Sequence, residues 1–442
     1  MTDATLPPLP HRYRPGTARA AFAYRDFRII WIGVFLSSVG TWMQTTLLGG
    51  YVDDRFHSGV AVALMVFALL GPTLLLSIPG GVLADKLPRR GFLIAMQSVQ
   101  MVFSAVMAVL VAKDASLGAL FACNLAIGIG QALNAPAFQA SIPMLVDRRD
   151  LNGAVALNST MINGSRVIGP AIAALLLALH VSVPQIFLLN ALTYFFVIAS
   201  LLVVHIPTAV GDHKERGWRQ VLTGVRIARE RPLLGRILWS LALFSFLCLP
   251  YVGLFPTVVR LNFGATGSTY QWLYVVWGAG ACAGALAIAT TLARFDKRTL
   301  IPPGFLGFAI SLGAFAVARQ VALAFPIGFL LGFFYFGTTT AMATVLQENL
   351  EDHERARVMS LWFMAFGGTV PLGVLALGPL VDRFGARWVL LFGAACALFL
   401  AWWCDLPRLA RASSAFRPHA FSYTLEPGHA AALHQDGVAT AE

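Results

Sequence analysis

Arg166 is the side chain whose position most strongly suggests chemistry, because it is the one charge within a long apolar run at 152–179. A guanidinium near the middle of a membrane helix costs roughly 2.5–3.5 kcal/mol even on insertion scales, so it must face a cavity or a partner. Asn152, Ser159 and Asn163 precede it at intervals that place all four side chains on one helix face. This stripe could form a cavity wall that holds an anionic or hydrogen-bonding ligand. Alternatively, Arg166 is structural and bonds backbone carbonyls or a neighbouring helix.

A second polar stripe lies on the apolar run at 116–138. Asn124, Gln131 and Asn134 are separated by seven and three residues, which again places them on one helix face. Their amides both donate and accept hydrogen bonds. We therefore treat Asn124 and Gln131 as candidate substrate-binding residues together with Asn163 and Arg166.

Proton coupling requires a titratable group that a cavity exposes alternately to each side of a membrane. No Asp or Glu lies near the centre of an apolar run. Asp53 and Asp54 lie at the end of the apolar run at 28–50, and Glu348 lies at the end of the run at 321–346. Burial or a cationic neighbour could tune any of these carboxylates. They are candidate coupling residues, and the alternative for each is a solvated acid at a helix end.

The elements that must position these side chains are long apolar runs. The 442 residues are 57% hydrophobic and 12% charged, whereas a soluble domain carries about 25% charge. Twelve runs are long enough to cross a bilayer as helices, at 28–50, 60–84, 92–112, 116–138, 152–179, 184–205, 235–259, 268–293, 300–318, 321–346, 358–380 and 388–404. The sequence predicts an all-α membrane protein with twelve transmembrane helices.

The basic residues are distributed unevenly between the two sides of this topology. Of the 32 Lys and Arg residues, 25 lie on the side that holds both termini. Such an excess is typical of the cytoplasmic side, so both termini are expected there and nucleic acid is not expected as a partner. The first 24 residues lack the apolar core of a cleavable signal peptide, so the first run must act as the targeting signal. The five cysteines have neither CxxC nor metal-ligand spacing and are expected to pack inside helices.

Internal repetition divides the chain into two halves. The tetrapeptide RIIW at 28–31 recurs as RILW at 236–239. We expect a cytoplasmic tail at 1–27, six-helix halves at 28–205 and 235–404, a cytoplasmic linker at 206–234, and a disordered cytoplasmic tail at 405–442. In the linker, apolar residues among basic ones at 218–231 predict an amphipathic helix on the lipid surface.

A dense charged turn, GGVLADKLPRRG at 80–91, separates the second and third runs. It resembles the loop between the second and third helices of the major facilitator superfamily, G-x-L-A-D-R/K-x-G-R-R/K, through Gly81, Leu83, Ala84, Asp85, Lys86, Arg89 and Arg90. Pro88 replaces the usual glycine, and both residues form turns. An acid at one helix end and bases across the turn can pair with neighbouring helices in one of two rocking states. We therefore assign gating to Gly81, Asp85, Arg89 and Arg90.

Three further segments resemble the exporters of this superfamily. Gly169 and Pro170 match the fifth-helix motif G-x-x-x-G-P-x-x-G-G in part, with Ser165, Ala173 and Ala174 at its other glycines. The segments 27–44 and 347–373 are similar to those of bacterial drug and siderophore exporters related to the enterobactin exporter. The resemblance covers about residues 24–404.

That resemblance implies a central cavity lined by the first, fourth, seventh and tenth helices. It adds Gln44, Tyr251 and Tyr335 to the candidate substrate-binding residues, with Trp42, Phe244, Thr338 and Thr339 as further candidate lining residues. Such an aromatic cavity with amide and hydroxyl groups suits an amphipathic molecule.

The expected function is secondary active transport in the bacterial inner membrane, by alternating access, with efflux of an amphipathic drug-like or siderophore-like molecule. The resemblance also implies antiport with protons and a monomer in contact with membrane lipid. Importer or lysolipid flippase activity is the alternative, and a receptor that does not transport is another. The sequence shows no nucleophile–base pair, phosphate-binding loop or metal-ligand spacing, so neither an enzyme nor a cofactor is expected.

Overall fold

A computed structural model describes residues 13–139, 141–204 and 218–404, without the side chains at 77–82, 84–86, 218–222, 352, 353 and 356. The first part contains α1 (Ala18–Ala23), α2 (Arg25–Phe56), α3 (Gly59–Lys86), α4 (Arg89–Ala112), α5 (Leu117–Gln139), α6 (Leu151–Ala178) and α7 (Val183–Val203). Two short 3-10 helices, η1 (Ile142–Met144) and η2 (Arg148–Asp150), precede α6.

The second part begins with α8 (Trp218–Glu230), α9 (Pro232–Leu243), the π-helix η3 (Phe244–Cys248), α10 (Pro250–Gly253) and α11 (Phe255–Phe263). It continues with α12 (Gly267–Ala289), α13 (Lys297–Val317), α14 (Val321–Glu348), α15 (Asp352–Phe363), the π-helix η4 (Met364–Gly368), α16 (Thr369–Phe384) and α17 (Ala386–Trp403). The described residues contain no strand. The fold is all-α, as the apolar runs predict.

Eleven helical segments of the described chain are long and apolar enough to cross a membrane. They correspond to the second through twelfth predicted runs. The first run lies in α2, which is 32 residues long but is not among the eleven. Polar residues explain the difference, because Ser37, Thr41, Gln44 and Thr46 interrupt its apolar stretch. Of these residues, Thr41, Gln44 and Thr46 line the cavity described below.

The seventh predicted run, 235–259, is not a continuous α-helix. It consists of α9, η3, α10 and α11, with Pro250 and Pro256 in the first turns of α10 and α11. Proline lacks an N–H and clashes with the preceding turn, so a helix is interrupted there. The eleventh run contains a similar interruption at η4, between α15 and α16. The sequence analysis did not anticipate either π-helix.

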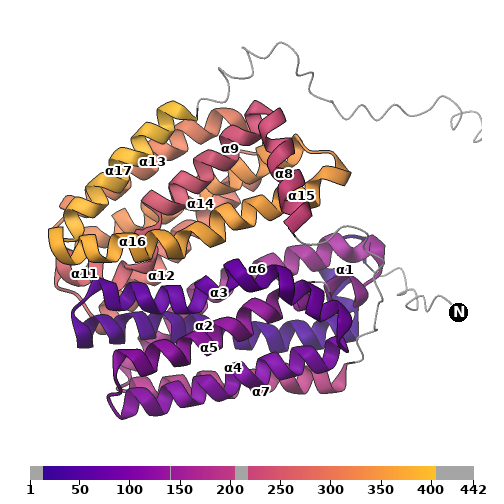
Figure 1. The fold of residues 1–442 in the computed structure, drawn as a ribbon, viewed down its shortest axis with the longest axis horizontal. Coiled ribbons are helices and arrows are strands. Elements are labelled where there is room, and N and C mark those ends of the chain that lie inside the picture. The colour runs from indigo at the N-terminus through magenta and orange to yellow at the C-terminus, as the bar shows by residue number, and fades with distance from the viewer. Residues whose placement is uncertain (1–12, 140, 205–217, 405–442) are drawn as a thin grey trace, which may run out of the picture. The chain divides into compact units, whose positions relative to one another are not determined.

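In Figure 1 the helices α2 to α7 lie beside one another, and α9 to α17 form a second set. We call these sets the N half and the C half. In the C half, α12 packs closely against α14 because glycines face the backbone: a Cβ at Gly280 or Gly284 would lie 2.0 Å from the carbonyl oxygen of Phe329 or Phe333. Only residues without a side chain permit this approach.

The halves contact each other along α6 and α12, and also at the end where α2 stops and α3 begins, which we call the far end. There α2 contacts α11, and α3 contacts α16 (Figure 1). Asp53 of α2 binds Arg260 of α11, and Asp382 of α16 accepts hydrogen bonds from Ser58 Oγ and the backbone N–H of Val60. Polar contacts therefore join the halves at this end.

At the opposite end, the terminal end, the described polar contacts lie within each half. Asp150 accepts hydrogen bonds from the Gly16 N–H and the Tyr24 hydroxyl, which ties α1 to the start of α6. In the C half, Arg231 pairs with Glu354 at 2.8 Å. The helix α8 occupies the segment where the sequence predicts an amphipathic helix, and it packs on α15. The predicted disordered tail, 405–442, lies outside the described residues.

Candidate substrate cavity

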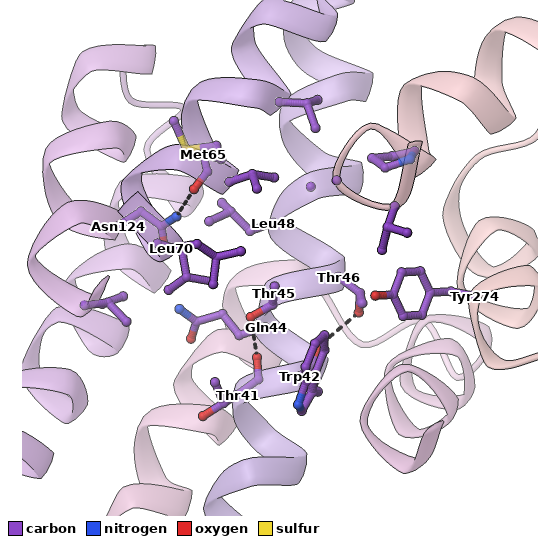
Figure 2. Close-up of a pocket in the computed structure, with 18 of the residues that line it drawn as sticks. Thr41, Trp42, Gln44, Thr45, Thr46, Leu48, Met65, Leu70, Asn124 and Tyr274 are labelled. Atoms are coloured by element: carbon purple, nitrogen blue, oxygen red, sulfur yellow. Dashed lines mark hydrogen bonds between the residues drawn. The ribbon is translucent and has the colours of Figure 1, made fainter. Parts of the chain in front are cut away.

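A cavity of about 200 Å³ lies between the N half and the C half. Its N-half wall comes from α2, α3, α5 and α7, and its C-half wall from α10, α11, α12 and α16. Figure 2 shows the aromatic side chain of Tyr274 extending from α12 toward Thr46 and Trp42 of α2, with Gln44 and Asn124 on the other side. No acid or base is among the residues that line it in the described part of the chain.

The N-half wall is polar because it contains a buried hydrogen-bond network. Asn190 of α7 donates from Nδ2 to Gln44 Oε1 at 2.7 Å and to Ser104 Oγ at 3.4 Å. The Tyr194 hydroxyl lies 3.1 Å from Thr41 Oγ1. These bonds fix the side chains that face the cavity, because a buried polar group without a partner costs about 1–3 kcal/mol.

Two α5 amides also belong to this wall. Asn124 donates from Nδ2 to the Met65 carbonyl at 2.8 Å, and this bond is drawn in Figure 2. Gln131 lines the cavity as well, and its Oε1 is buried without a hydrogen-bond partner among the described residues. A buried amide oxygen that lacks a protein partner can accept a hydrogen bond from a ligand. Of the seven predicted binding residues, Gln44, Asn124 and Gln131 line the cavity.

The C-half wall contains two aromatic side chains beside Val252, Gly253, Pro256 and Val370. Tyr270 and Tyr274 of α12 line the cavity, and behind them Tyr274 packs on Trp277 with ring centroids 5.1 Å apart. The Trp277 Nε1–H donates to the Tyr251 hydroxyl at 2.9 Å, and Tyr335 stacks on Trp277 at 6.0 Å. Tyr251 and Tyr335 therefore support the aromatic wall from inside the C half without lining the cavity.

Three other predicted lining residues are buried in the C half. Phe244 packs edge-on against Phe308 with centroids 4.8 Å apart. Thr339 Oγ1 donates to the carbonyl of Tyr335, one turn earlier in α14. Thr338 is 2% exposed. Trp42, by contrast, lines the cavity.

Arg166 lies behind Trp42. Its guanidinium carbon is 5.1 Å from the centroid of the Trp42 ring and 5.5 Å from that of Phe336. It therefore lies between an N-half and a C-half aromatic ring, an arrangement that stabilises a cation by about 0.5–2 kcal/mol. Arg166 Nε is buried without a hydrogen-bond partner among the described residues. Asn163, one turn earlier, donates from Nδ2 to the Ser159 carbonyl at 2.9 Å.

The three candidate coupling acids occupy different environments. Asp53 is 1% exposed and accepts hydrogen bonds from Thr257 Oγ1 at 2.7 Å and from Arg260 Nε at 2.6 Å. Asp54, in the last turn of α2 beyond the predicted span, is exposed. Partial burial and the charge of Asp53 raise its pKa. Glu348 is the exposed last residue of α14.

The gating motif is described in part. Arg89 Nη1 donates to the Met144 sulfur at 3.1 Å. Arg90 Nε donates to the Leu201 carbonyl at 2.6 Å, and its Nη2 bonds the Leu202 carbonyl. Arg90 therefore caps the carboxyl end of α7, where a cation is favoured by the helix dipole. Gly81 lies in α3, and the Asp85 side chain lies outside the described part of the chain.

Sequence reasoning missed Asn190, Tyr270 and Tyr274. Asn190 is an amide within the apolar run at 184–205, whose other amide, Gln185, lies at its start, and a polar residue inside such a run is a signal that could have identified it. The two tyrosines lie on the eighth predicted run, outside the helices that the resemblance assigned to the cavity. Their position at the cavity depends on how the two halves pack against each other, which the sequence alone does not show.

Comparison with known proteins places these features in context. Residues 16–426 match the profile of a family described as "Transmembrane secretion effector". The staphyloferrin A transporter of Staphylococcus aureus is 26% identical over 357 residues, which cover 79% of this chain and 88% of that protein. Macrolide efflux protein A of Streptococcus pyogenes is 22% identical over 385 residues, 83% of this chain and 92% of that protein.

Solved structures with the same fold include the nucleoside transporter NupG, with a TM-score of 0.70, 14% identity and coverage of 86% of this chain and 99% of that one. A bacterial homologue of the lysosomal transporter Spinster superposes with a TM-score of 0.69 and 14% identity, over 90% of this chain and 100% of that one. At this identity the match describes the fold alone, which is that of major facilitator transporters.

Proposed function

This chain belongs to the transmembrane secretion effector family of the major facilitator superfamily, and from that premise we propose that it exports an amphipathic small molecule. It is a membrane transporter and not an enzyme. The proposal includes alternating access driven by protons and a bacterial plasma membrane location with both termini cytoplasmic. In that orientation the far end faces outward and the terminal end faces the cytoplasm.

The observation that carries the proposal is the contrast between the two walls of the cavity. Gln44, Asn124 and Gln131 offer hydrogen bonds on one side, and Tyr270 and Tyr274 offer aromatic surface on the other. A molecule with one polar and one apolar face matches both walls. The names of two relatives, a staphyloferrin A transporter and a macrolide efflux protein, support export of sizeable small molecules.

Arg166 extends this proposal toward anionic substrates. The cavity wall carries no acid among the described residues, and Arg166 lies one aromatic ring away from it, against Trp42. A rotation of Trp42 would expose the guanidinium to the cavity, where it could pair with a substrate carboxylate or phenolate. Asn163 precedes Arg166 by one turn and would contribute a second polar contact. Tyr251 and Tyr335 hold the opposite wall.

Transport by reconstituted protein under an imposed pH gradient tests the function. The probes are a lipophilic cationic dye and an anionic catecholate chelator, with Arg166→Ala as the variant and Thr160→Ala, an exposed site on the same helix, as its control. Gradient-driven chelator movement that Arg166→Ala abolishes supports a proton-coupled exporter of anionic molecules. Dye movement indifferent to Arg166→Ala supports a multidrug pump in which Arg166 is structural. Absence of gradient dependence contradicts proton coupling.

The direction of substrate transport is tested in cells that lack other pumps. Lowered accumulation of the dye or chelator supports export. Raised accumulation supports the alternative, an importer, and movement of lysolipid between leaflets in liposomes supports a flippase.

Gating by the charged turn predicts a kinetic effect. Arg90 holds the end of α7, and we expect Asp85, near the end of α3, to pair in only one of the two rocking states. Asp85→Asn is expected to slow turnover about tenfold, equivalent to about 1.4 kcal/mol on the barrier, with substrate affinity changed less than about threefold. Loss of affinity with normal turnover contradicts the assignment of Gly81, Asp85, Arg89 and Arg90 to gating.

A further inference from the structure

The far end contains a cluster of charges that crosses from one half to the other. Asp53 of the N half binds Arg260 of the C half through two hydrogen bonds, at 2.6 Å to Nε and 3.0 Å to Nη2. In the reverse direction, Asp382 of the C half accepts a hydrogen bond from Ser58 Oγ at 2.7 Å at the start of α3. Each half thus supplies a carboxylate that accepts hydrogen bonds from the other half, and the bond to Asp53 comes from a cation.

Asp53 differs from the other acids of this cluster in being fully buried. It is 1% exposed, whereas the Arg260 side chain is 19% exposed. A buried carboxylate stays ionised when a cation and hydrogen-bond donors compensate for lost hydration. Arg260 and Thr257 supply that compensation, and both belong to the opposite half.

Other charged or titratable groups near Asp53 and Arg260 come from α2 and its C-cap, from α12 and from α16. Asp54 lies on α2 and His57 is its C-cap, Tyr270 faces Asp53 from α12, and Asp382 lies near Arg260 from α16. Arg55 turns away and pairs with Asp114 at 2.6 Å within the N half. Arg260 is therefore the guanidinium that compensates this group of carboxylates among the described residues, and its bond to Asp53 raises its pKa.

We propose that Asp53 is the proton-binding residue of the transport cycle and that its ion pair with Arg260 is the outer gate; this rests on the proposed function of a proton-coupled exporter. When the far ends separate, Asp53 loses both C-half partners while the negative charge of Asp54 remains beside it. Its carboxylate then takes a proton from the outside solution. When the ends close, Arg260 returns and the Asp53 carboxyl releases that proton.

The central cavity lies about one helical turn from Asp53, on the side to which the proton is released in this proposal. Gly49, one turn before Asp53 on α2, and Pro256, next to Thr257, both line the cavity wall. Closure of the far end would therefore move one proton from outside to the cavity, and onward to the cytoplasm when the terminal end opens. This direction of proton movement is the one that drives export of a substrate loaded from the cytoplasm.

The first test measures the gate without a substrate. Spin labels are placed at Gly118→Cys on α5 and Arg319→Cys before α14, both exposed far-end positions in opposite halves, in a background with the native cysteines replaced and in lipid nanodiscs. A Cβ at Gly118 meets nothing within 4 Å, so the label fits. In the otherwise native chain we expect the longer-distance population to increase at least threefold from pH 7.5 to 5.5.

Variants of the pair decide between the proposal and a structural role. Asp53→Asn is expected to give the same distance distribution at both pH values, and Arg260→Lys to keep the pH response. Asp114→Asn is the matched control, because it breaks an aspartate–arginine pair of equal length at the same end but within one half. A pH response that survives in Asp53→Asn, or is lost in Asp114→Asn, overturns the proposal.

The second test separates this inference from the proposed function. In proteoliposomes with the dye and chelator probes, Asp53→Asn is expected to lose gradient-driven transport at least tenfold while exchange of probe across the membrane stays within threefold. Gradient-driven transport that persists in Asp53→Asn contradicts Asp53 as the proton site. If the native chain moves neither probe but the labels respond to pH through Asp53, the gate stands and the proposed substrate class fails.

Discussion

The N half and the C half face the same cavity with different interiors. The N half is held near the cavity by amide and hydroxyl bonds centred on Asn190. The C half is held by stacked rings around Phe255, Trp277 and Tyr335. Hydrogen bonds are directional and fail when one partner is removed, whereas aromatic pairs are favourable over a range of centroid separations, about 4.5–7 Å. The difference indicates that one wall fixes the orientation of a ligand and the other adapts to its shape.

The largest loss of stability is expected from a substitution at the glycine contact between α12 and α14 of the C half. Gly280→Ala would place a Cβ 2.0 Å from the Phe329 carbonyl oxygen, so α12 and α14 must separate and the rings between them lose contact. We expect a loss of more than about 3 kcal/mol of stability and little monodisperse protein by size-exclusion chromatography. Gly118→Ala, where nothing lies within 4 Å, is the control. Normal yield of Gly280→Ala would contradict close helix packing here.

Removal of the Asn190 side chain tests the hydrogen-bonded wall of the N half. Asn190→Ala leaves Gln44 Oε1 without its donor, which is expected to cost about 1–3 kcal/mol of stability. It should also weaken probe binding, because Gln44 is then free to turn. A thermal unfolding assay and a binding titration measure the two effects. An unchanged unfolding temperature would show that the network does not hold this wall.

The adaptable wall is tested at the cavity surface. Tyr274→Leu removes a ring that Figure 2 shows pointing at the α2 residues. We expect the Kd of an aromatic probe to rise about fivefold, equivalent to about 1 kcal/mol. Tyr270→Leu should have a similar effect if the wall acts as a surface and not through one contact. A rise in Kd larger than that caused by Asn190→Ala would mean that the C-half wall contributes more to probe binding than the N-half wall.

The smallest effect is expected inside the ring cluster. Tyr251→Phe keeps the ring but removes the acceptor for Trp277 Nε1–H, at a cost of about 1 kcal/mol. Because Tyr251 does not line the central cavity, probe affinity should stay within about twofold. A large loss of affinity would mean that Tyr251 contacts substrate in another state of the transport cycle.

Much of the fold could be predicted from the sequence because a bilayer limits it to long apolar helices. The amides at 124 and 131 were located by their spacing alone. The position of Arg166 behind Trp42 could not be predicted, because helical spacing gives the face of a residue but not the neighbour that covers it. The Asp53–Arg260 pair joins residues 207 apart in sequence, and only the meeting of two separately folded halves brings them together.

The π-helices η3 and η4 have a consequence for how the C half moves. A π-turn contains one residue more than an α-turn, and π-turns inside α-helices occur frequently at functional sites. Before η3, α9 is held at the terminal end by Arg236, which donates to the Trp403 carbonyl at 2.6 Å. After η3, α11 carries Arg260 at the far end. The π-helix η3 therefore separates a segment anchored at the terminal end from one anchored at the far end, and we expect the far end to tilt about η3 while the terminal end stays in place.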